Sequence, residues 1–338
     1  MKKMINNAMD FVDESLKGIL LAYPQILVAH PQDIRAVYRT EGSIARKVAI
    51  VTGGGYGHIP VFLGYVGKGL CDGVAVGNVF TSPACETILN VTRQVDSGNG
   101  VLYLFGNYMG DSMNFEMASE LAEMEGIITG TVKVSDDVAS GPREQWKERR
   151  GIAGIFFAYK IAGAYSEQMA PLDEVKRIAE KVVANTATFG VAFSSCSLPG
   201  LERPIFEIGE EEMEIGMGIH GETGIRRGRL ETSRELTGTL LPTIIQDLSI
   251  KTGDRVAVLV NGLGATSQEE LYILYKDVNE YLLKKGIEPA RVFIGEFATS
   301  FEMAGASISL LKLDDELLEL LDVPAYSPFV SIGGVRRG

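Results

Sequence analysis

Two polar side chains follow predicted β-strands at positions that suit proton transfer. His58 ends a glycine-rich stretch directly after the apolar residues 47–52, and Asp111 follows the apolar residues 101–105. Loops after the carboxyl ends of parallel strands share one edge of a sheet, where ligands bind. A carboxylate near an imidazole is the usual equipment for removing a proton from an alcohol. The spacing therefore indicates a proton-transfer site, although an aspartate at the N-cap of a helix needs no further function.

The glycine-rich stretch itself, residues 53–58 (GGGYGH), favours a bound ligand over a tight turn without one. Glycine permits positive φ and lets a ligand approach the backbone amides closely. A second motif, residues 216–221 (GMGIHG), fits the pattern GxGxxG, but no amphipathic helix follows it and Leu241 stands where a ribose-binding acid belongs. The sequence also lacks a Walker A loop. It indicates no nucleotide site, so the donor of any transferred group has to come from elsewhere.

The chain has only three histidines, and two of them have glycine neighbours. His58 and His220 therefore have open space on one side of the ring, which suits a small ligand, whereas a lone histidine is commonly structural. His30 lies in a predicted loop and is interpreted as incidental. Two histidines without carboxylates at ligand spacing do not form a metal site, so no metal is expected.

Short apolar runs alternate with helix-period patterns along the chain. Strands are predicted at residues 47–52, 101–105, 191–194, 255–260, 291–297 and 307–313, and helices at residues 111–126, 171–186, 268–285 and 314–321. Asp111 is the predicted N-cap of its helix, Ser267 and Glu270 form a capping-box pair, and Gly126 and Gly286 mark helix ends. The alternation predicts an α/β fold with largely parallel strand pairing. A boundary near residues 185–190 gives an N-terminal domain, 1–187, and a C-terminal domain, 188–334.

Composition and charge exclude several classes of protein. The 338 residues are 46% hydrophobic and 22% charged, which is typical of a folded globular protein. The net charge of −12 repels phosphate backbones, so no direct nucleic-acid binding is expected. The sequence predicts no signal peptide and no membrane span. Cys71, Cys85 and Cys196 are odd in number and widely spaced, which favours a reduced cytoplasm.

Seven motifs occur in order and together resemble one family. They are GGGYGH, GYVGKG, GNVFTSP, GNYMGD, RRGIAG, FSSCSLPG and GMGIHGETG. Their series resembles the ketose-binding (DhaK-like) subunit of the dihydroxyacetone kinase family, over roughly residues 1–330. The resemblance implies a two-domain α/β subunit with mixed or parallel sheets flanked by helices, which forms a homodimer. It also implies no cofactor in this chain, because ADP or ATP with Mg is expected on a separate nucleotide-binding partner.

The resemblance assigns His220 a covalent role. In the family, the histidine of the GIHGE motif attacks the ketone carbon of dihydroxyacetone and holds it as a hemiaminal. An imidazole nitrogen adds to a ketone and not to an alcohol, so ketoses are separated from glycerol by reactivity. Glu222 follows at the expected place and is expected to help orient the site.

The remaining site residues also come from the resemblance. His58 and Asp111 correspond to the pair that acts on the hydroxyl receiving phosphate, with the aspartate as general base. The backbones of Gly54 and Gly55 are expected to line the ligand. The loop departs from the usual GGGSGHEP, because Tyr56 and Ile59 replace serine and glutamate. Tyr56 is expected to add bulk beside the ligand, and the loss of the acid removes a possible partner of His58.

Two further departures point to a branch of the family. Gly106 replaces a substrate-contacting lysine of the usual KNYTGD motif, and Asn78 lies in GNVF. Both resemble a branch that includes kinases of four-carbon ketoses such as erythrulose. Together with the altered glycine loop, they fit either a changed substrate or lost phosphoryl transfer with binding retained.

Two functions therefore stay open. The first is an enzyme subunit of glycerol metabolism that binds dihydroxyacetone or a similar ketose, while a nucleotide-binding partner or a phosphotransferase protein supplies the phosphate. The alternative is a catalytically silent sensor of dihydroxyacetone that acts as coactivator of a TetR-type transcription regulator of the kinase operon. The acidic composition assigns any DNA contact to that regulator.

Overall fold

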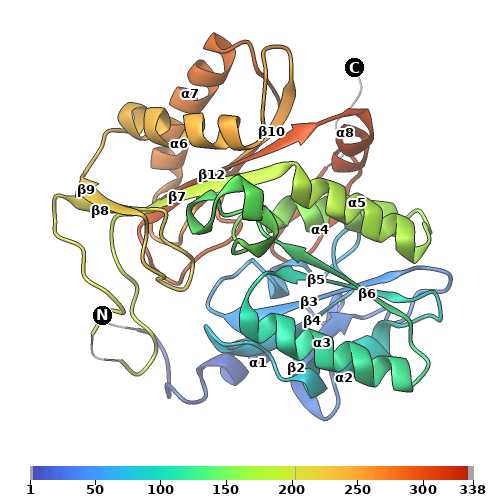
Figure 1. The fold of residues 1–338 in the computed structure, drawn as a ribbon. Coiled ribbons are helices and arrows are strands. Elements are labelled where there is room, and N and C mark those ends of the chain that lie inside the picture. The colour runs from blue at the N-terminus through green and yellow to red at the C-terminus, as the bar shows by residue number, and fades with distance from the viewer. Residues whose placement is uncertain (1–2, 202, 334–338) are drawn as a thin grey trace. The chain divides into compact units, whose positions relative to one another are not determined.

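The chain folds into two compact units in the computed structural model, which describes residues 3–201 and 203–333. The unit called here the glycine-loop unit contains residues 3–134, 157–182 and 317–333. The unit called the His220 unit contains residues 135–156 and 183–316. Each is built on its own six-stranded sheet (Figure 1).

The sheet of the glycine-loop unit is mixed, with a parallel centre. Its strands, in spatial order, are β1 (Leu27–His30), β2 (Asp33–Arg39), β4 (Gly73–Val79), β3 (Ala49–Tyr56), β5 (Val101–Gly106) and β6 (Thr129–Val134). The pairs β3–β4, β3–β5 and β5–β6 are parallel, and β1–β2 and β2–β4 are antiparallel. The predicted parallel pairing is thus confirmed for the strands that precede His58 and Asp111.

Helices cover both faces of this sheet (Figure 1). Those of the unit are α1 (Phe11–Ala22), α2 (Cys85–Val95), α3 (Met109–Met124) and most of α4 (Ile155–Ser166), α5 (Leu172–Ala184) and α8 (Asp315–Leu321). On one face, Phe115 of α3 stacks on Phe105 of β5, with ring centroids 4.1 Å apart. On the other, the hydroxyl of Tyr159 in α4 bonds Thr52 Oγ1 at 2.6 Å. A short hairpin of β13 (Ala325–Tyr326) and β14 (Ser331–Ile332) completes the unit.

The sheet of the His220 unit is mostly antiparallel. In spatial order its strands are β11 (Glu288–Gly295), β10 (Arg255–Gly262), β12 (Gly305–Leu313), β7 (Thr186–Ala192), β8 (Glu212–Ile215) and β9 (Arg226–Arg229). Only the pair β10–β11 is parallel within this described sheet. The prediction of largely parallel pairing is wrong here, because β7, β8 and β9 are joined by loops rather than crossover helices, and loops suffice for antiparallel neighbours.

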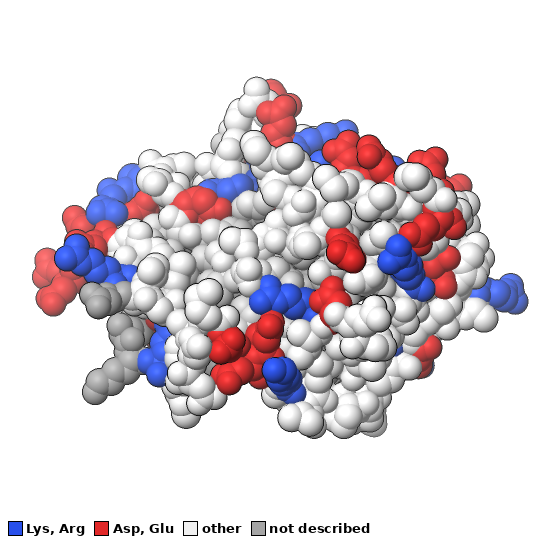
Figure 2. All heavy atoms as spheres, turned by 90° about the horizontal axis from the view of Figure 1, so that it is seen from below, with Lys and Arg blue, Asp and Glu red and all other residues white. Residues whose placement is uncertain are grey.

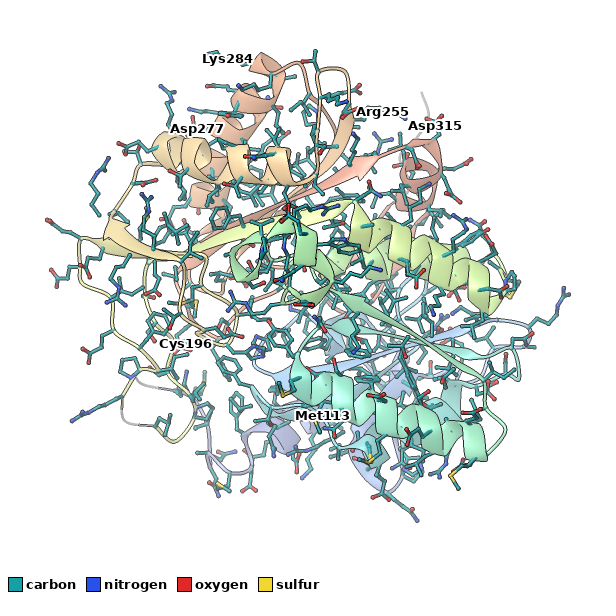
Figure 3. The ribbon with its side chains drawn as sticks, viewed as in Figure 1. Met113, Cys196, Arg255, Asp277, Lys284 and Asp315 are labelled. Atoms are coloured by element: carbon teal, nitrogen blue, oxygen red, sulfur yellow. The ribbon has the colours of Figure 1, made fainter. Side chains whose placement is uncertain are left out.

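Two helices, α6 (Ser233–Asp247) and α7 (Gln268–Lys284), cover one face of the second sheet. A hydrogen bond connects the two helices: Ser233 Oγ of α6 donates to Asp277 Oδ2 of α7 at 2.7 Å. Arg255, which begins β10, pairs with Asp315 at the start of α8 (2.6 Å; Figure 3). The predicted capping box of α7 is confirmed: the Ser267 side chain accepts from Glu270 N.

One helix start differs from its prediction. The helix α3 begins at Met109, with Tyr108 as an extended N-cap residue, so Asp111 lies inside the first turn. The N-cap prediction for Asp111 is therefore wrong, although a carboxylate in the first turn still meets the positive end of the helix dipole. The C-terminal prediction is confirmed, since Gly126 has φ +80° after the last turn.

The chain passes between the two units at residues 134/135, 156/157, 182/183 and 316/317. The division predicted from the sequence, 1–187 and 188–334, has a single boundary, whereas the chain of the structure crosses between the units four times. Residues 135–156 join the His220 unit because Asp136 is tied into it: its carbonyl accepts from Thr188 N at 2.7 Å. Its carboxylate accepts from Ile152 N and Gly154 N at 2.8 and 2.7 Å. The chain after residue 317 is held in the glycine-loop unit, where Tyr326 N donates to Lys68 O.

Charged side chains of both signs are interspersed over the face shown in Figure 2. Within residues 3–201 and 203–333, no helix has the length and apolar character needed to cross a lipid bilayer.

A buried lysine makes the stability of the glycine-loop unit depend on pH. Lys160 Nζ is buried and donates to Leu320 O at 2.9 Å. Burial lowers the pKa of Lys160 to about 8, against the opposing effect of Asp322. The unfolded chain, with a lysine pKa of about 10.4, binds more protons between these two values, so stability rises with pH across that window. Relative to Lys160→Met, the unfolding free energy of the wild type is expected to rise by about 2 kcal/mol between roughly pH 7.5 and 9.5.

Denaturant titrations at a series of pH values measure this difference. Lys176→Met removes a half-exposed lysine of α5 and serves as the matched control. Parallel curves for the wild type and Lys160→Met would contradict the assignment.

Candidate functional site

The glycine loop is shaped by close packing within its own unit. A Cβ atom on Gly54 would overlap the ring of Phe62, and one on Gly55 would lie 2.7 Å from Thr81 N. Gly57 has φ +116°, a conformation that side chains other than glycine rarely adopt. The tight-turn alternative thus accounts for these three glycines by itself, and their contact with a ligand stays a prediction.

Two aromatic rings fix the plane of the His58 imidazole. His58 is 1% exposed and stacks on Phe80 with centroids 4.7 Å apart and planes 7° from parallel. Phe62 meets the same imidazole edge-on at 6.2 Å. Phe80 lies in the loop after β4, inside the motif GNVFTSP. Its place in one of the seven motifs is the sequence signal by which this residue could be found. Nothing in the sequence pattern singled out Phe62.

His58 and Asp111 lie at one edge of their sheet. His58 follows β3, Phe80 follows β4, and Asp111 lies in the first turn of α3 after β5. These three strands are parallel neighbours, so their carboxyl ends meet at a common edge, as the sequence predicted. Asp111 is only 7% exposed. A buried carboxylate and a fixed imidazole at one edge are suited to accepting a proton from a hydroxyl.

Tyr56 is directed toward α1. Its hydroxyl bonds Ser15 Oγ at 2.5 Å, and its ring meets Phe11 edge-on at 6.0 Å. Burial raises the pKa of this phenol, so it stays a neutral hydrogen-bonding group. The Tyr56 side chain thus packs α1 against the end of β3, a structural role that is independent of any ligand.

His220 lies in the loop between β8 and β9 and is paired with Glu222. Glu222 Oε1 lies 3.1 Å from His220 Nδ1, and its Oε2 accepts from His220 N at 2.9 Å. The His220 side chain is 19% exposed. A carboxylate beside Nδ1 favours the neutral tautomer that carries its proton on Nδ1, and in that tautomer Nε2 keeps its lone pair. An imidazole in this tautomer can add through Nε2 to an electrophilic carbon.

The Glu222 carboxylate is ionised despite its partial burial. Burial opposes ionisation, but the hydrogen bond and charge of His220, together with the Arg150 charge, lower the pKa of Glu222 to about 2. The carboxylate is therefore available as an acceptor for the Nδ1 proton throughout the neutral range.

The chain that leads into His220 is anchored in the His220 unit. Met217 and Ile219 are buried in the His220 unit, and Ile219 O accepts from Ser300 Oγ at 2.5 Å. Ser300 Oγ lies 3.8 Å from the Sγ of Cys196, which follows β7 in the motif FSSCSLPG (Figure 3). Buried residues before His220 and a backbone anchor next to it thus fix the base of the loop.

The residues predicted for the site fall into two groups. The glycine-loop unit holds Gly54, Gly55, Tyr56, His58 and Asp111, with His58 and Asp111 at the same sheet edge. The His220 unit holds His220 and Glu222 in one loop.

One α/β unit thus carries an imidazole and a carboxylate at a sheet edge, and the other carries a histidine paired with a carboxylate, an arrangement typical of proteins that bind small ligands. Residues 17–329 match the Dak1 domain. The chain therefore belongs to the Dak1 domain family, which confirms the family predicted from the seven motifs.

Known relatives cover the whole chain. It is 42% identical to the "PTS-dependent dihydroxyacetone kinase 2, dihydroxyacetone-binding subunit DhaK" of Listeria innocua, over 98% of this chain and 100% of that protein. It is 40% identical to the L-erythrulose 1-kinase of Mycolicibacterium smegmatis, over 100% of this chain but only 58% of that protein. The solved structure of the dihydroxyacetone kinase operon co-activator DhaQ matches with a TM-score of 0.89 and 32% identity, over 97% of this chain and 100% of that one. The α/β fold with mixed sheets is thereby confirmed.

Proposed function

We propose that this chain is the ketose-binding subunit of a multi-component dihydroxyacetone-type kinase. The observation that carries the proposal is the His220–Glu222 pair, which leaves Nε2 of His220 as a nucleophile. The substrate is dihydroxyacetone or a related short ketose. The 42% identity to a dihydroxyacetone-binding subunit over the full length of both chains supports this assignment.

Capture of the ketose follows from the tautomer. The Nε2 lone pair attacks the carbonyl carbon, and the π electrons of the C=O bond move to the oxygen, which takes up a proton. As the new C–N bond forms, the Glu222 carboxylate takes the Nδ1 proton and passes it to solvent, while solvent supplies the proton that the oxygen takes up, so that the product is a neutral hemiaminal. Glycerol has no electrophilic carbon, so it forms no adduct.

Asp111 is proposed to remove the proton from the terminal hydroxyl that receives phosphate, with His58 assisting. The burial of Asp111 and its place at the sheet edge of His58 support these roles. The phosphate is proposed to come from a separate nucleotide-binding subunit carrying ADP or ATP with Mg, or from a phosphotransferase protein. Four-carbon ketoses are further candidate substrates, because Gly106 and Asn78 resemble the erythrulose branch and an erythrulose kinase is 40% identical.

The alternative function is a sensor that binds the ketose and acts as coactivator of a TetR-type regulator. Its support is the co-activator structure, which is 32% identical over the full length of both chains. Tyr56 supports it less than the sequence indicated, because this side chain packs against α1. Ile59 remains in its favour. In either function the chain is proposed to work as a cytoplasmic homodimer without touching DNA itself.

Turnover separates the two functions. Purified protein is combined with dihydroxyacetone or erythrulose, a nucleotide-binding partner subunit and a phosphoryl donor, beside an undisputed kinase of the family. We expect phosphorylated ketose at a rate near that of the control. Absent product, with ketose binding intact and the control active, would establish the sensor instead, and a ligand-dependent complex with a TetR-type regulator would then be sought.

A further inference from the structure

We propose that Arg150 is a positioning residue for His220. It belongs to the motif RRGIAG, to which the proposed function assigns no task. In this proposal Arg150 holds Glu222 and the start of the His220 loop, so that Glu222 stays on Nδ1 and Nε2 remains the nucleophile. The expected effect of Arg150 on the adduct rests on the proposed covalent capture. The contacts of Arg150 with Asp137, Gly216 and Glu222 do not depend on that proposal.

The guanidinium group of Arg150 spans three parts of the His220 unit. Its Nη2 and Nε lie 2.7 and 2.9 Å from Asp137 Oδ2. Its Nη2 also donates to Gly216 O, the first carbonyl of the loop, at 3.2 Å. Its Nη1 lies 4.0 Å from Glu222 Oε2, the oxygen that accepts from His220 N. A planar fork with several fixed donors can make these contacts together, which a flexible ammonium group cannot.

Asp137 fixes the position of the Arg150 guanidinium group. It is 1% exposed, and its other oxygen, Oδ1, accepts from Ala139 N at 3.0 Å at the start of the short helix Val138–Ser140. A buried carboxylate with a backbone partner has little freedom to move. Arg150 thus connects a rigid part of the unit to the loop that carries the nucleophile.

Gly218 supplies an independent observation. A Cβ atom at this position would overlap Glu222 Oε2 and would lie 2.8 Å from Arg150 Nη1. A side chain at this position would therefore displace the ends of Glu222 and Arg150 from the places where they approach each other. This packing explains the second glycine of GMGIHG, a motif that resembles a nucleotide-binding pattern without its helix.

Variants of Arg150 and Gly218, each with a matched control, test the proposal. Arg150→Gln removes the guanidinium group, and Gly218→Ala separates Arg150 from Glu222 without removing either charge. Arg226→Gln is the matched control for the first, since Arg226 ends the same loop and is exposed. Gly228→Ala is the control for the second, because a Cβ there meets no atom within 4 Å among the described residues.

Two readouts are measured on each variant. Nitrogen-15 shifts of histidine-labelled protein, above the ordinary histidine pKa of about 6.5, report the tautomer of His220. With only three histidines in the chain, His220→Ala assigns its signals. The affinity for dihydroxyacetone carrying ¹³C at the carbonyl is measured from the signal of the tetrahedral carbon.

We expect Arg150→Gln and Gly218→Ala to lose the dominant Nδ1–H tautomer and to weaken the adduct about 10- to 100-fold, as misplacement of a reacting group does. Arg150→Lys is expected to restore the adduct only in part. Both controls are expected to match the wild type. A wild-type tautomer and affinity in Arg150→Gln would overturn the proposal. If the wild type itself forms no adduct, the proposed function fails, while the tautomer comparison still decides the role of Arg150.

Discussion

Replacing His220 with alanine is expected to abolish covalent capture of dihydroxyacetone. The variant removes the imidazole whose Nδ1 is paired with the Glu222 carboxylate, and with it the proposed nucleophile Nε2. Without a C–N bond the protein can bind the ketose only by shape and hydrogen bonds, which glycerol offers almost equally well. Selectivity for the ketone over glycerol is therefore expected to fall to about one, since it depends on reactivity rather than on fit.

Carbonyl-labelled dihydroxyacetone makes this measurable, because the ketone signal is replaced by that of a tetrahedral carbon when the adduct forms. His30→Ala is the matched control: its Nδ1 accepts from Gln32 N in a different part of the chain, and its adduct is expected to equal that of the wild type. Thermal unfolding of both variants checks that the fold persists. An adduct in His220→Ala would refute the hemiaminal proposal.

Asp111→Asn is expected to reduce phosphoryl transfer by about 10²- to 10⁴-fold, the range that general-base catalysis contributes. Asparagine has nearly the same shape, so it fits the buried first turn of α3, but it cannot accept a proton. Ketose binding is expected to be unchanged, because the hemiaminal forms on His220. The expected result is thus a loss in kcat with little change in the adduct. Steady-state turnover with the partner subunit and donor, together with the ¹³C measurement, separates the two quantities.

Asp173→Asn provides the control for this prediction. Asp173 also lies in the first turn of a helix, α5, and is exposed, so its replacement makes the same chemical change away from His58. Its turnover is expected to match the wild type. Unchanged turnover in Asp111→Asn would remove the general-base role from Asp111, and lost ketose binding would show that Asp111 serves the structure of the site.

The sequence by itself determined the α/β class, part of the helices and strands, and the family. The apolar runs became strands β3, β5, β10 and β12, because a buried strand needs a short apolar stretch whatever surrounds it. The capping box at Ser267 and the helix-ending Gly126 are local hydrogen-bonding and φ requirements, so a short stretch of sequence specifies them. Seven ordered motifs sufficed for the family, which the Dak1 match confirmed.

Only the tertiary structure decided how these parts pair and what supports the reactive groups. The antiparallel order of the second sheet depends on which loops return the chain, and strand periodicity does not encode it. The start of α3 at Met109 placed Asp111 inside the helix. Glycines that indicated a ligand are needed where Phe62 and Thr81 pack against the loop.

The contact of Arg150 with Asp137 and Glu222 joins residues far apart in the sequence. Such contacts follow from the packing of complete elements, which no local pattern specifies. The chemistry of His58, Asp111 and His220 was therefore readable from residue types and motifs, whereas the side chains that hold these residues in place became visible only in the folded chain.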